Sequence, residues 1–301
     1  MSASAHSFDS LYNEKPIVLH TATGDIFGTV TTPNNFSKGA VALLIAGSGP
    51  TDRDGNNPYA MNAGLLKLAH ALADNNIASV RYDKRGVAKS TAAGKSEADL
   101  RFDDYVNDAK DWVTLLKKDP AYTSIVIIGH SEGSLIGMYA AGNANKYISI
   151  AGAGRSADLV LKEQLSKQPQ TIQDMALPII DSLKAGVTVA DTDPMLASIF
   201  RPSVQPYLIS WFVKDPQVEI KKLTIPILII QGTNDIQVSV EDAKFLLAAN
   251  PKAQLILVKN MNHIFRITEG DMNSNIATYN KASLPISDEM VNGIVHFIKT
   301  N

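Results

Sequence analysis

The most constraining feature of this sequence is an apolar run that leads without a break into a glycine-flanked serine. Residues 125–128 are Ile-Val-Ile-Ile, and Gly129-His130-Ser131-Glu132-Gly133 follows directly, before small and apolar residues that suit a helix. A buried strand, a tight turn and a helix in this order place the serine at the apex of a strained turn, which the flanking glycines leave room for. The pattern predicts an α/β chain in which Ser131 stands clear of a sheet edge.

Two similar patterns elsewhere lack this context. Gly94-Lys95-Ser96 and Gly154-Arg155-Ser156 also place a serine two residues after a glycine. Neither follows an apolar strand run, so neither serine is expected on such a turn. The strand and helix around Ser131 therefore select it as the candidate nucleophile, the alternative being a serine with only a structural role in its turn.

Short apolar runs alternate with helical patterns along the chain. The runs suit parallel strands that are buried on both faces: 40–46, 77–82, 124–129, 147–151, 225–231 and 254–258. Helical patterns cover 63–75, 103–118, 135–143, 240–249 and 287–299. Apolar and polar residues alternate in 16–20 and in 25–31, on either side of Thr23-Gly24-Asp25, and this pattern predicts an antiparallel hairpin. We therefore predict a mostly parallel sheet wrapped by helices, with the hairpin at one edge.

One segment interrupts this alternation. Residues 155–222 contain no strand-like run, and their helical pattern is broken by several prolines and is rich in leucine, methionine and aromatic residues. We expect a helical cap inserted over the carboxyl edge of the sheet, with residues 1–154 and 223–301 forming the core domain. The alternative is a small packed subdomain that makes no contact with a ligand.

Composition narrows the classes of protein that this chain can belong to. Of 301 residues, 45% are hydrophobic and the net charge is −2, which is typical of a globular protein and makes nucleic acid an unsuitable partner. The absence of cysteine excludes disulfides and cysteine-ligated metals. No apolar stretch is long enough for a membrane span, and residues 1–10 lack the features of a signal peptide. We expect a cytoplasmic protein, or a periplasmic or secreted one if a signal peptide has been removed, either monomeric or homodimeric.

A serine hydroxyl needs a base, and the base needs an orienting acid that precedes it in the chain. Asp235 follows the predicted strand 225–231 by a glycine-containing loop, so its carboxylate should emerge at the same sheet edge as Ser131. Asp191 and Asp193 lie in the predicted insertion, a less suitable place for a rigid acid. A turn or helix-capping role is the alternative for Asp235.

His263 is the candidate base, because it is the histidine that lies on a loop after a strand and after this acid. His130 adjoins the serine but should point the other way along the turn, so we expect it to pack or to form a backbone hydrogen bond. The remaining histidines occupy other settings: His6, His20, His70 and His296.

Acyl transfer also requires N–H donors for the developing oxyanion. The amide of Glu132 follows the serine and opens a helix, whose dipole favours negative charge. The second donor should come from the loop Gly47-Ser48-Gly49-Pro50, and we expect the amide of Ser48, with that of Gly49 as the competitor. Phosphate binding by this loop is the alternative, but it has neither P-loop nor dinucleotide-binding spacing.

With these elements in place, the chain resembles the α/β-hydrolase superfamily over essentially its whole length. It looks most like bacterial serine carboxylesterases whose oxyanion loop continues into Asp-Arg-Asp, here within residues 47–56, and whose fourth strand is followed by Asp-x-Arg-Gly-x-Gly-x-Ser, here Asp83 to Ser90. Ala88 stands in place of the second glycine of that motif. The resemblance implies an α/β-hydrolase fold with a mostly parallel eight-stranded sheet, flanking helices and a helical cap.

The resemblance also implies a serine carboxylesterase that forms an acyl-enzyme and acts on small ester substrates. In this reading Ser131 is the nucleophile, His263 the base and Asp235 the acid, and the amides of Ser48 and Glu132 form the oxyanion hole. No metal or organic cofactor is implied. The apolar cap favours short- to medium-chain acyl groups. A peptidase, lactonase, thioesterase or acyltransferase of the same fold, or a non-catalytic ligand-binding module, are the alternatives.

Several charged residues have no assigned chemical role. We expect an ion-pair network that braces the loops of the site, since charges near a buried site are normally paired: Asp52, Arg53, Asp54, Asp83 and Arg85. The carboxylate of Glu132 is expected to meet either a polar group of the substrate or one of these arginines.

Overall fold

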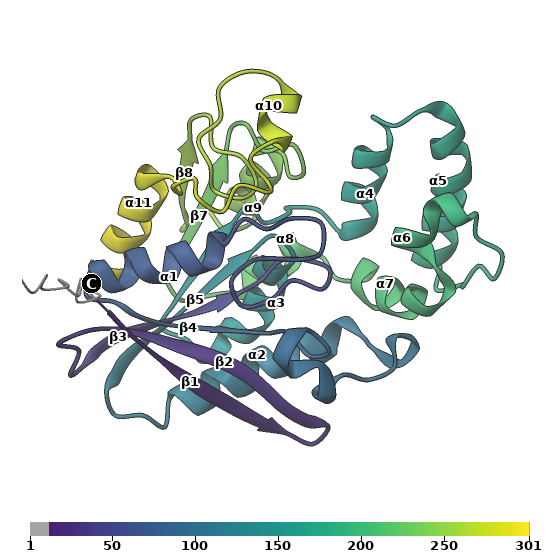
Figure 1. The fold of residues 1–301 in the computed structure, drawn as a ribbon. Helices are drawn as coiled ribbons and strands as arrows, with labels where there is room; N and C mark the ends of the chain where they lie inside the picture. Colours follow the sequence, from purple (N-terminus) through teal and green to yellow (C-terminus); the bar gives the residue numbers. More distant parts are fainter. Residues whose placement is uncertain (1–11, 301) are drawn as a thin grey trace, which may run out of the picture.

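The computed structural model describes residues 12–300 of the chain. The predictions for residues 1–10, and the placement of His6, lie outside this range. Figure 1 shows a central sheet with helices on both sides and a group of helices projecting from one end. The described strands and helices therefore form the layered α/β arrangement that the alternating pattern predicts.

Eight strands form one sheet in the order β1-β2-β4-β3-β5-β6-β7-β8. They are β1 (Tyr12–Thr21), β2 (Gly24–Pro33), β3 (Gly39–Ile45), β4 (Ala78–Tyr82), β5 (Tyr122–His130), β6 (Lys146–Ile150), β7 (Ile227–Gly232) and β8 (Gln254–Val258). The hairpin β1–β2 lies at one edge, β2 is antiparallel to β4, and every other neighbouring pair is parallel. The predicted eight-stranded, mostly parallel sheet with an antiparallel edge is confirmed.

Helices cover both faces of this sheet. In the core they are α1 (Gly64–Asp74), α2 (Phe102–Leu116), α3 (Glu132–Ala140), α9 (Val240–Ala249), α10 (Met272–Ile276) and α11 (Asp288–Lys299). Successive residues of β3 pack on opposite sides, because side chains alternate along a strand. Leu43 and Ile45 join a core with α2, α3 and α9, whereas Ala42 and Leu44 join one with α1 and α11.

The helical segment between β6 and β7 contains α4 (Ala157–Leu165), α5 (Gln170–Lys184), α6 (Ala197–Phe200), α7 (Gln205–Phe212) and α8 (Pro216–Lys222). In Figure 1, α4 to α7 project to the right of the sheet. We call residues 155–222 the helical insertion. Lys214 is paired with Asp103 of α2 at 2.7 Å, and the Trp211 ring stacks on Phe102 with centroids 6.1 Å apart. These contacts fasten the insertion to the core beside the carboxyl ends of the strands.

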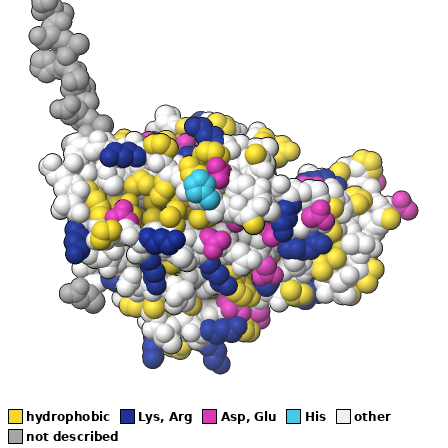
Figure 2. All heavy atoms as spheres, turned by 90° about the horizontal axis from the view of Figure 1, so that it is seen from below, with side chains coloured by type: hydrophobic (Ala, Val, Ile, Leu, Met, Phe, Trp, Pro, Cys, Tyr) yellow, Lys and Arg dark blue, Asp and Glu magenta, His cyan; other side chains and the backbone are white. Residues whose placement is uncertain are grey.

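The face seen in Figure 2 carries basic and acidic side chains interspersed with apolar ones. This mixture agrees with the net charge of −2, and it produces no broad field of one sign on that face. Within residues 12–300, no helix combines the length and the apolar character needed to cross a membrane.

Candidate active site

Ser131 occupies the turn between β5 and α3 with φ 55° and ψ −122°, a region that side-chain-bearing residues rarely adopt. Its amide donates to the carbonyl of Ile150 at 3.0 Å, which anchors the turn to β6. A Cβ at Gly129 would lie 2.2 Å from the carbonyl oxygen of Gly133, and one at Gly133 would lie 2.3 Å from that of Ile45. Only glycine fits at either position, so the flanking glycines permit the strained turn that exposes the serine.

Three backbone amides beside this turn are available to an incoming group. Ser131, Glu132 and Ser48 all line one cavity. Within the described part of the chain, neither the Ser48 amide nor the Glu132 amide donates a hydrogen bond, and the same holds for Gly49. The structure thus places the predicted donors together at the cavity, and the choice between Ser48 and Gly49 stays a prediction.

His263 and Asp235 form a buried pair. Nδ1 of His263 lies 2.8 Å from Oδ2 of Asp235, and their side chains are 5% and 1% exposed. Burial alone would raise the pKa of the Asp235 carboxyl, but the neighbouring His263 ring and the amides of Gln237 and Val238 hold that pKa below its usual value. An ionised Asp235 accepts a hydrogen bond from the Nδ1–H group of His263, which keeps the proton on Nδ1 and leaves the lone pair on Nε2.

The loop that carries His263 is held by its neighbour Asn262. The side-chain oxygen of Asn262 accepts hydrogen bonds from the amides of Ile264 and Arg266, and its nitrogen donates to Asn275 and Thr278. Asn275 belongs to α10, a short helix that the sequence pattern did not predict. In the sequence, the signal for this role is the position of Asn262 directly before the candidate base, and no role is predicted for it above.

His130 joins the serine turn to the His263 loop through a hydrogen bond to the backbone, which is one of the two roles expected for it. Its Nε2 lies 2.9 Å from the carbonyl oxygen of His263, and the two rings are 4.8 Å apart between centroids. No hydrogen bond joins Ser131 Oγ to His263 Nε2 in this structure, in which both residues are described. Burial of the ring, together with the adjacent His263, lowers the pKa of His130 from 6.5 to about 3.

We expect this lowered pKa to make stability depend on pH. Between pH 6.5 and about 3, the unfolded chain binds a proton at His130 that the folded protein does not bind, so the free energy of unfolding falls as the pH falls. One proton corresponds to about 1.4 kcal/mol per pH unit. Urea unfolding at several pH values in this range gives the free energy of unfolding as a function of pH. In His130→Gln, the slope of this free energy against pH should be shallower than in wild type by up to the equivalent of one proton.

His20→Gln is the matched control, because it makes the same substitution at a side chain that is 81% exposed. If His130→Gln keeps the wild-type slope, the His130 ring is charged in the folded protein and the assignment is wrong.

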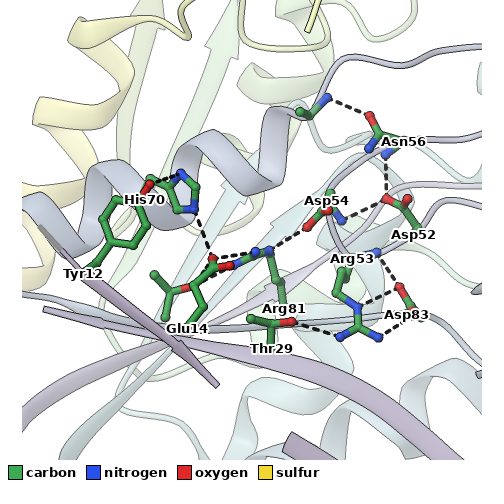
Figure 3. A network of polar contacts seen from close by, with 12 residues as sticks. Tyr12, Glu14, Thr29, Asp52, Arg53, Asp54, Asn56, His70, Arg81 and Asp83 are labelled. Carbon is green, nitrogen blue, oxygen red and sulfur yellow. Dashed lines mark hydrogen bonds and ion pairs between the residues drawn. The ribbon is translucent and has the colours of Figure 1, made fainter. Parts of the chain in front are cut away.

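The charged loops around the site are joined by a network of ion pairs (Figure 3). Arg53 pairs with Asp83 through two N–H groups, at 3.0 and 2.6 Å. Arg81 of β4 bridges Asp54 and Glu14, at 2.8 and 2.7 Å. These contacts fasten the loop after β3 to β1 and to the loop after β4, as the structural interpretation of the charges expects.

Two members of the predicted network lie in other contacts. The Asp52 carboxylate accepts hydrogen bonds from the amides of Asp54 and Asn56 and so shapes its own loop. Arg85 pairs with Asp108 of α2, a carboxylate for which no role is predicted from the sequence. In the same loop, Ala88 has φ 47°, a conformation that favours the glycine of the family motif.

The carboxylate of Glu132 does not pair with an arginine, contrary to one of our two expectations for it. It lies between Lys84 Nζ, at 3.3 Å, and the hydroxyl of Tyr207, at 2.5 Å. The side chains of Lys84 and Glu132 are each 1% exposed. Lys84 follows the end of β4 and Tyr207 belongs to α7, and neither was predicted as part of the site.

A cavity of about 660 Å³ opens beside Ser131, between the carboxyl edge of the sheet and the helical insertion. Leu135 of α3 lines it from the core, and Val160, Leu161, Leu208 and Trp211 line it from the insertion. Such a volume suits a small organic ligand. Among residues 12–300, no three or more His, Cys, Asp or Glu side chains gather as a metal site would require.

Comparisons with known proteins agree with this arrangement. The sequence profile of the family described as "Serine aminopeptidase, S33" matches residues 63–219. Esterase EstD from Thermotoga maritima is 24% identical over 274 residues, which cover 86% of this chain; the chain spans 61% of the length of that relative.

The fold is shared with solved structures at lower identity. Est1E from Butyrivibrio proteoclasticus with bound ferulic acid is 18% identical, with a TM-score of 0.63 over 94% of this chain and 98% of that one. The Pyrococcus furiosus esterase Pf2001 is 16% identical, with a TM-score of 0.62 over 99% and 95% of the two chains. The family profile covers more than half of the sequence, and the chain therefore belongs to the serine aminopeptidase S33 family and has the α/β-hydrolase fold.

Proposed function

We propose that this protein is a serine carboxylesterase that works through an acyl-enzyme. The observation that carries the proposal is the buried pair His263–Asp235 beside the strained Ser131 turn, with free backbone amides at the same cavity. Serine hydrolases use a serine, an oriented histidine and backbone N–H donors to generate and stabilise a tetrahedral intermediate, and these residues would supply each of them. The esterase relatives named above support an ester as the substrate.

In the proposed reaction, Ser131 Oγ attacks the ester carbonyl carbon while Nε2 of His263 takes the hydroxyl proton. The oxyanion accepts hydrogen bonds from the amides of Ser48 and Glu132, and Asp235 stabilises the imidazolium. Collapse of the intermediate breaks the ester C–O bond, and His263 returns the proton to the departing alcohol. Water, activated by the same histidine, then hydrolyses the acyl-enzyme. Binding of substrate has to close the contact between Ser131 and His263, which is commonly loose in unliganded enzymes.

We propose that the helical insertion acts as the cap over the acyl site. Its apolar side chains at the cavity suit short- to medium-chain acyl groups, and the volume of about 660 Å³ leaves room for the alcohol part of the ester. Thioesters and acyl transfer would use the same machinery, and the leaving group and acceptor decide between them.

Aminopeptidase activity is the second candidate, because the family description names it. A peptide amino terminus is best held by a free carboxylate. Among the described residues, two carboxylates line the cavity, Glu97 and Glu132, and they are paired with Arg201 and Lys84 respectively. This pairing favours a neutral ester over a peptide with a charged amino terminus.

The test combines labelling and hydrolysis. A fluorophosphonate should label Ser131 alone, as located by peptide mass mapping, and p-nitrophenyl esters from acetate to decanoate should be hydrolysed with an optimum at short to medium chains. An aminoacyl p-nitroanilide should be cleaved far more slowly, because of the paired carboxylates.

Ser156→Ala is the matched control, since Ser156 also follows Gly-x in the sequence but directly precedes α4 and does not line the cavity. It should be labelled like the wild type. Wild-type protein that is neither labelled nor active on any ester contradicts the proposal, and preferred cleavage of the anilide supports the aminopeptidase instead.

A further inference from the structure

Lys84 is a fully buried cation with a contact that the proposed reaction does not yet use. Its Nζ donates to the carbonyl oxygen of Gly47 at 2.6 Å and reaches the Glu132 carboxylate at 3.3 Å. It also lies over the Tyr105 ring, 4.9 Å from the centroid. Burying an ammonium group is costly unless its donors are satisfied, so this placement needs a structural or functional reason.

The Gly47 carbonyl belongs to the same peptide unit as the Ser48 amide. A trans peptide is planar, and its C=O and N–H point in opposite directions. A donor that holds the Gly47 carbonyl from one side therefore fixes the direction of the Ser48 N–H on the other side. The Ser48 N–H makes no hydrogen bond within the described residues, and Ser48 lines the cavity beside Ser131.

We propose that Lys84 is a positioning residue for the oxyanion hole: by holding the Gly47 carbonyl, it aims the Ser48 N–H at the oxyanion. The proposal rests on the proposed esterase function. The positive charge of Lys84 also polarises the peptide unit, which makes its N–H a stronger donor to a developing anion.

Glu132 of α3 and Tyr207 of α7 connect Lys84 to two further helices. Glu132 supplies the other proposed oxyanion amide from its backbone, and its carboxylate holds Lys84 in place. The hydroxyl of Tyr207 donates to the same carboxylate from α7 of the helical insertion. Lys84 thus contacts both residues that carry the proposed oxyanion amides or their peptide units, Gly47 and Glu132, on the side away from the cavity. The helical insertion contacts Glu132 through Tyr207.

The test removes the Lys84 ammonium group. It measures stabilisation of the transition state, through kcat and the affinity for an oxyanion analogue, separately from binding of the substrate, through KM. Lys84→Met keeps the length of the stem but leaves the Gly47 carbonyl unheld. Since losing one oxyanion donor lowers kcat by about 100- to 1000-fold, we expect kcat for a p-nitrophenyl ester to fall by about 100-fold with little change in KM. Affinity for a trifluoromethyl ketone, whose adduct carries an oxyanion, should fall with kcat.

Lys84→Met also leaves the Glu132 carboxylate without its cation, so a second variant separates the two effects. Lys84→Met/Glu132→Gln contains no unpaired buried charge, and its kcat should stay as low as that of Lys84→Met. Recovery of wild-type kcat in the double variant would mean that the unpaired carboxylate, and not the Gly47 carbonyl, caused the loss, which overturns the proposal.

Chemical rescue provides an independent readout. The chain contains no cysteine, so Lys84→Cys carries a single thiol that bromoethylamine converts to a lysine analogue in the unfolded protein before refolding. This treatment should restore most of kcat, whereas treated wild type should be unchanged. Failure of the correctly refolded, alkylated protein to regain activity contradicts the assignment.

Lys146→Met is the matched control, because Lys146 also donates to backbone carbonyls and lies over an aromatic ring, but does not line the cavity. It should keep wild-type kcat. If wild type is active and Lys84→Met is as active, only the role of Lys84 is wrong. If wild type neither hydrolyses esters nor reacts with a fluorophosphonate, the proposed function fails and the role of Lys84 fails with it.

Discussion

Ester hydrolysis by Ser131→Ala is expected to fall by about 10⁶-fold in kcat, and by a similar factor in His263→Ala. Both changes remove the same step, the attack of an oxygen whose proton is taken by Nε2. The losses should therefore not multiply: Ser131→Ala/His263→Ala should be no slower than either single variant. The variants should still hydrolyse the ester about 10³-fold faster than the uncatalysed reaction in water, because the oxyanion amides and substrate binding remain.

Steady-state kinetics with a p-nitrophenyl ester, supported by active-site titration to exclude wild-type contamination, measure these losses. Circular dichroism and urea unfolding should show that each variant folds. Losses that multiply in the double variant would mean that Ser131 and His263 act in separate steps, and the proposed pairing would be wrong.

The second large effect is expected for Asp235→Asn, with kcat lower by about 10⁴-fold. Oδ1 of Asp235 accepts two backbone N–H groups, from Gln237 and Val238, at 2.8 and 3.0 Å. These two donors on Oδ1 outweigh the single side-chain donor of Gln231 on Oδ2, so the oxygen of an asparagine should stay on the Oδ1 side, which turns its NH₂ group toward Nδ1 of His263. Nδ1 then has to accept, so the proton moves to Nε2 and the histidine cannot take the serine proton.

Asp191→Asn is the matched control for this variant. Asp191 is an exposed carboxylate of the helical insertion and one of the two less suitable acids, with Asp193, so its replacement should leave kcat unchanged. The pH–rate profile separates a wrong tautomer from a misfolded site, because activity of Asp235→Asn should recover partly at high pH, where hydroxide replaces the missing base. Turnover of Asp235→Asn within tenfold of wild type would exclude Asp235 as the orienting acid.

Much of the fold could be predicted because its signals are local. Apolar runs of strand length and helical patterns are properties of neighbouring residues, and they place every core strand to within a few residues. The helix α10 was missed because its residues Met272–Ile276 are few and mostly polar, and its role is to supply Asn275 to the network around Asn262. That network is formed by residues distant in sequence and leaves no periodic signal.

The charged residues near the site show the same difference between what local sequence patterns predict and what only contacts between distant segments decide. Asp83 and Arg53 could be expected to pair from their positions after neighbouring strands, and they do. Lys84, between Asp83 and Arg85, appeared to be another polar loop residue. Its burial depends on α2, α3 and α7 closing around it, and no pattern within its own loop reports this.

The sequence by itself determined the α/β class of this protein, the strand–turn–helix that strains Ser131, and the chain order of serine, acid and histidine. These follow from local periodicity and from glycines that only a tight turn requires. Tertiary structure alone decided that His263 and Asp235 meet at 2.8 Å, that Lys84 holds the Gly47 carbonyl, and that Tyr207 reaches Glu132 from the helical insertion. The physical reason is that directional hydrogen bonds and buried charges depend on distances between segments far apart in the chain, which are set when the sheet and its helices pack together.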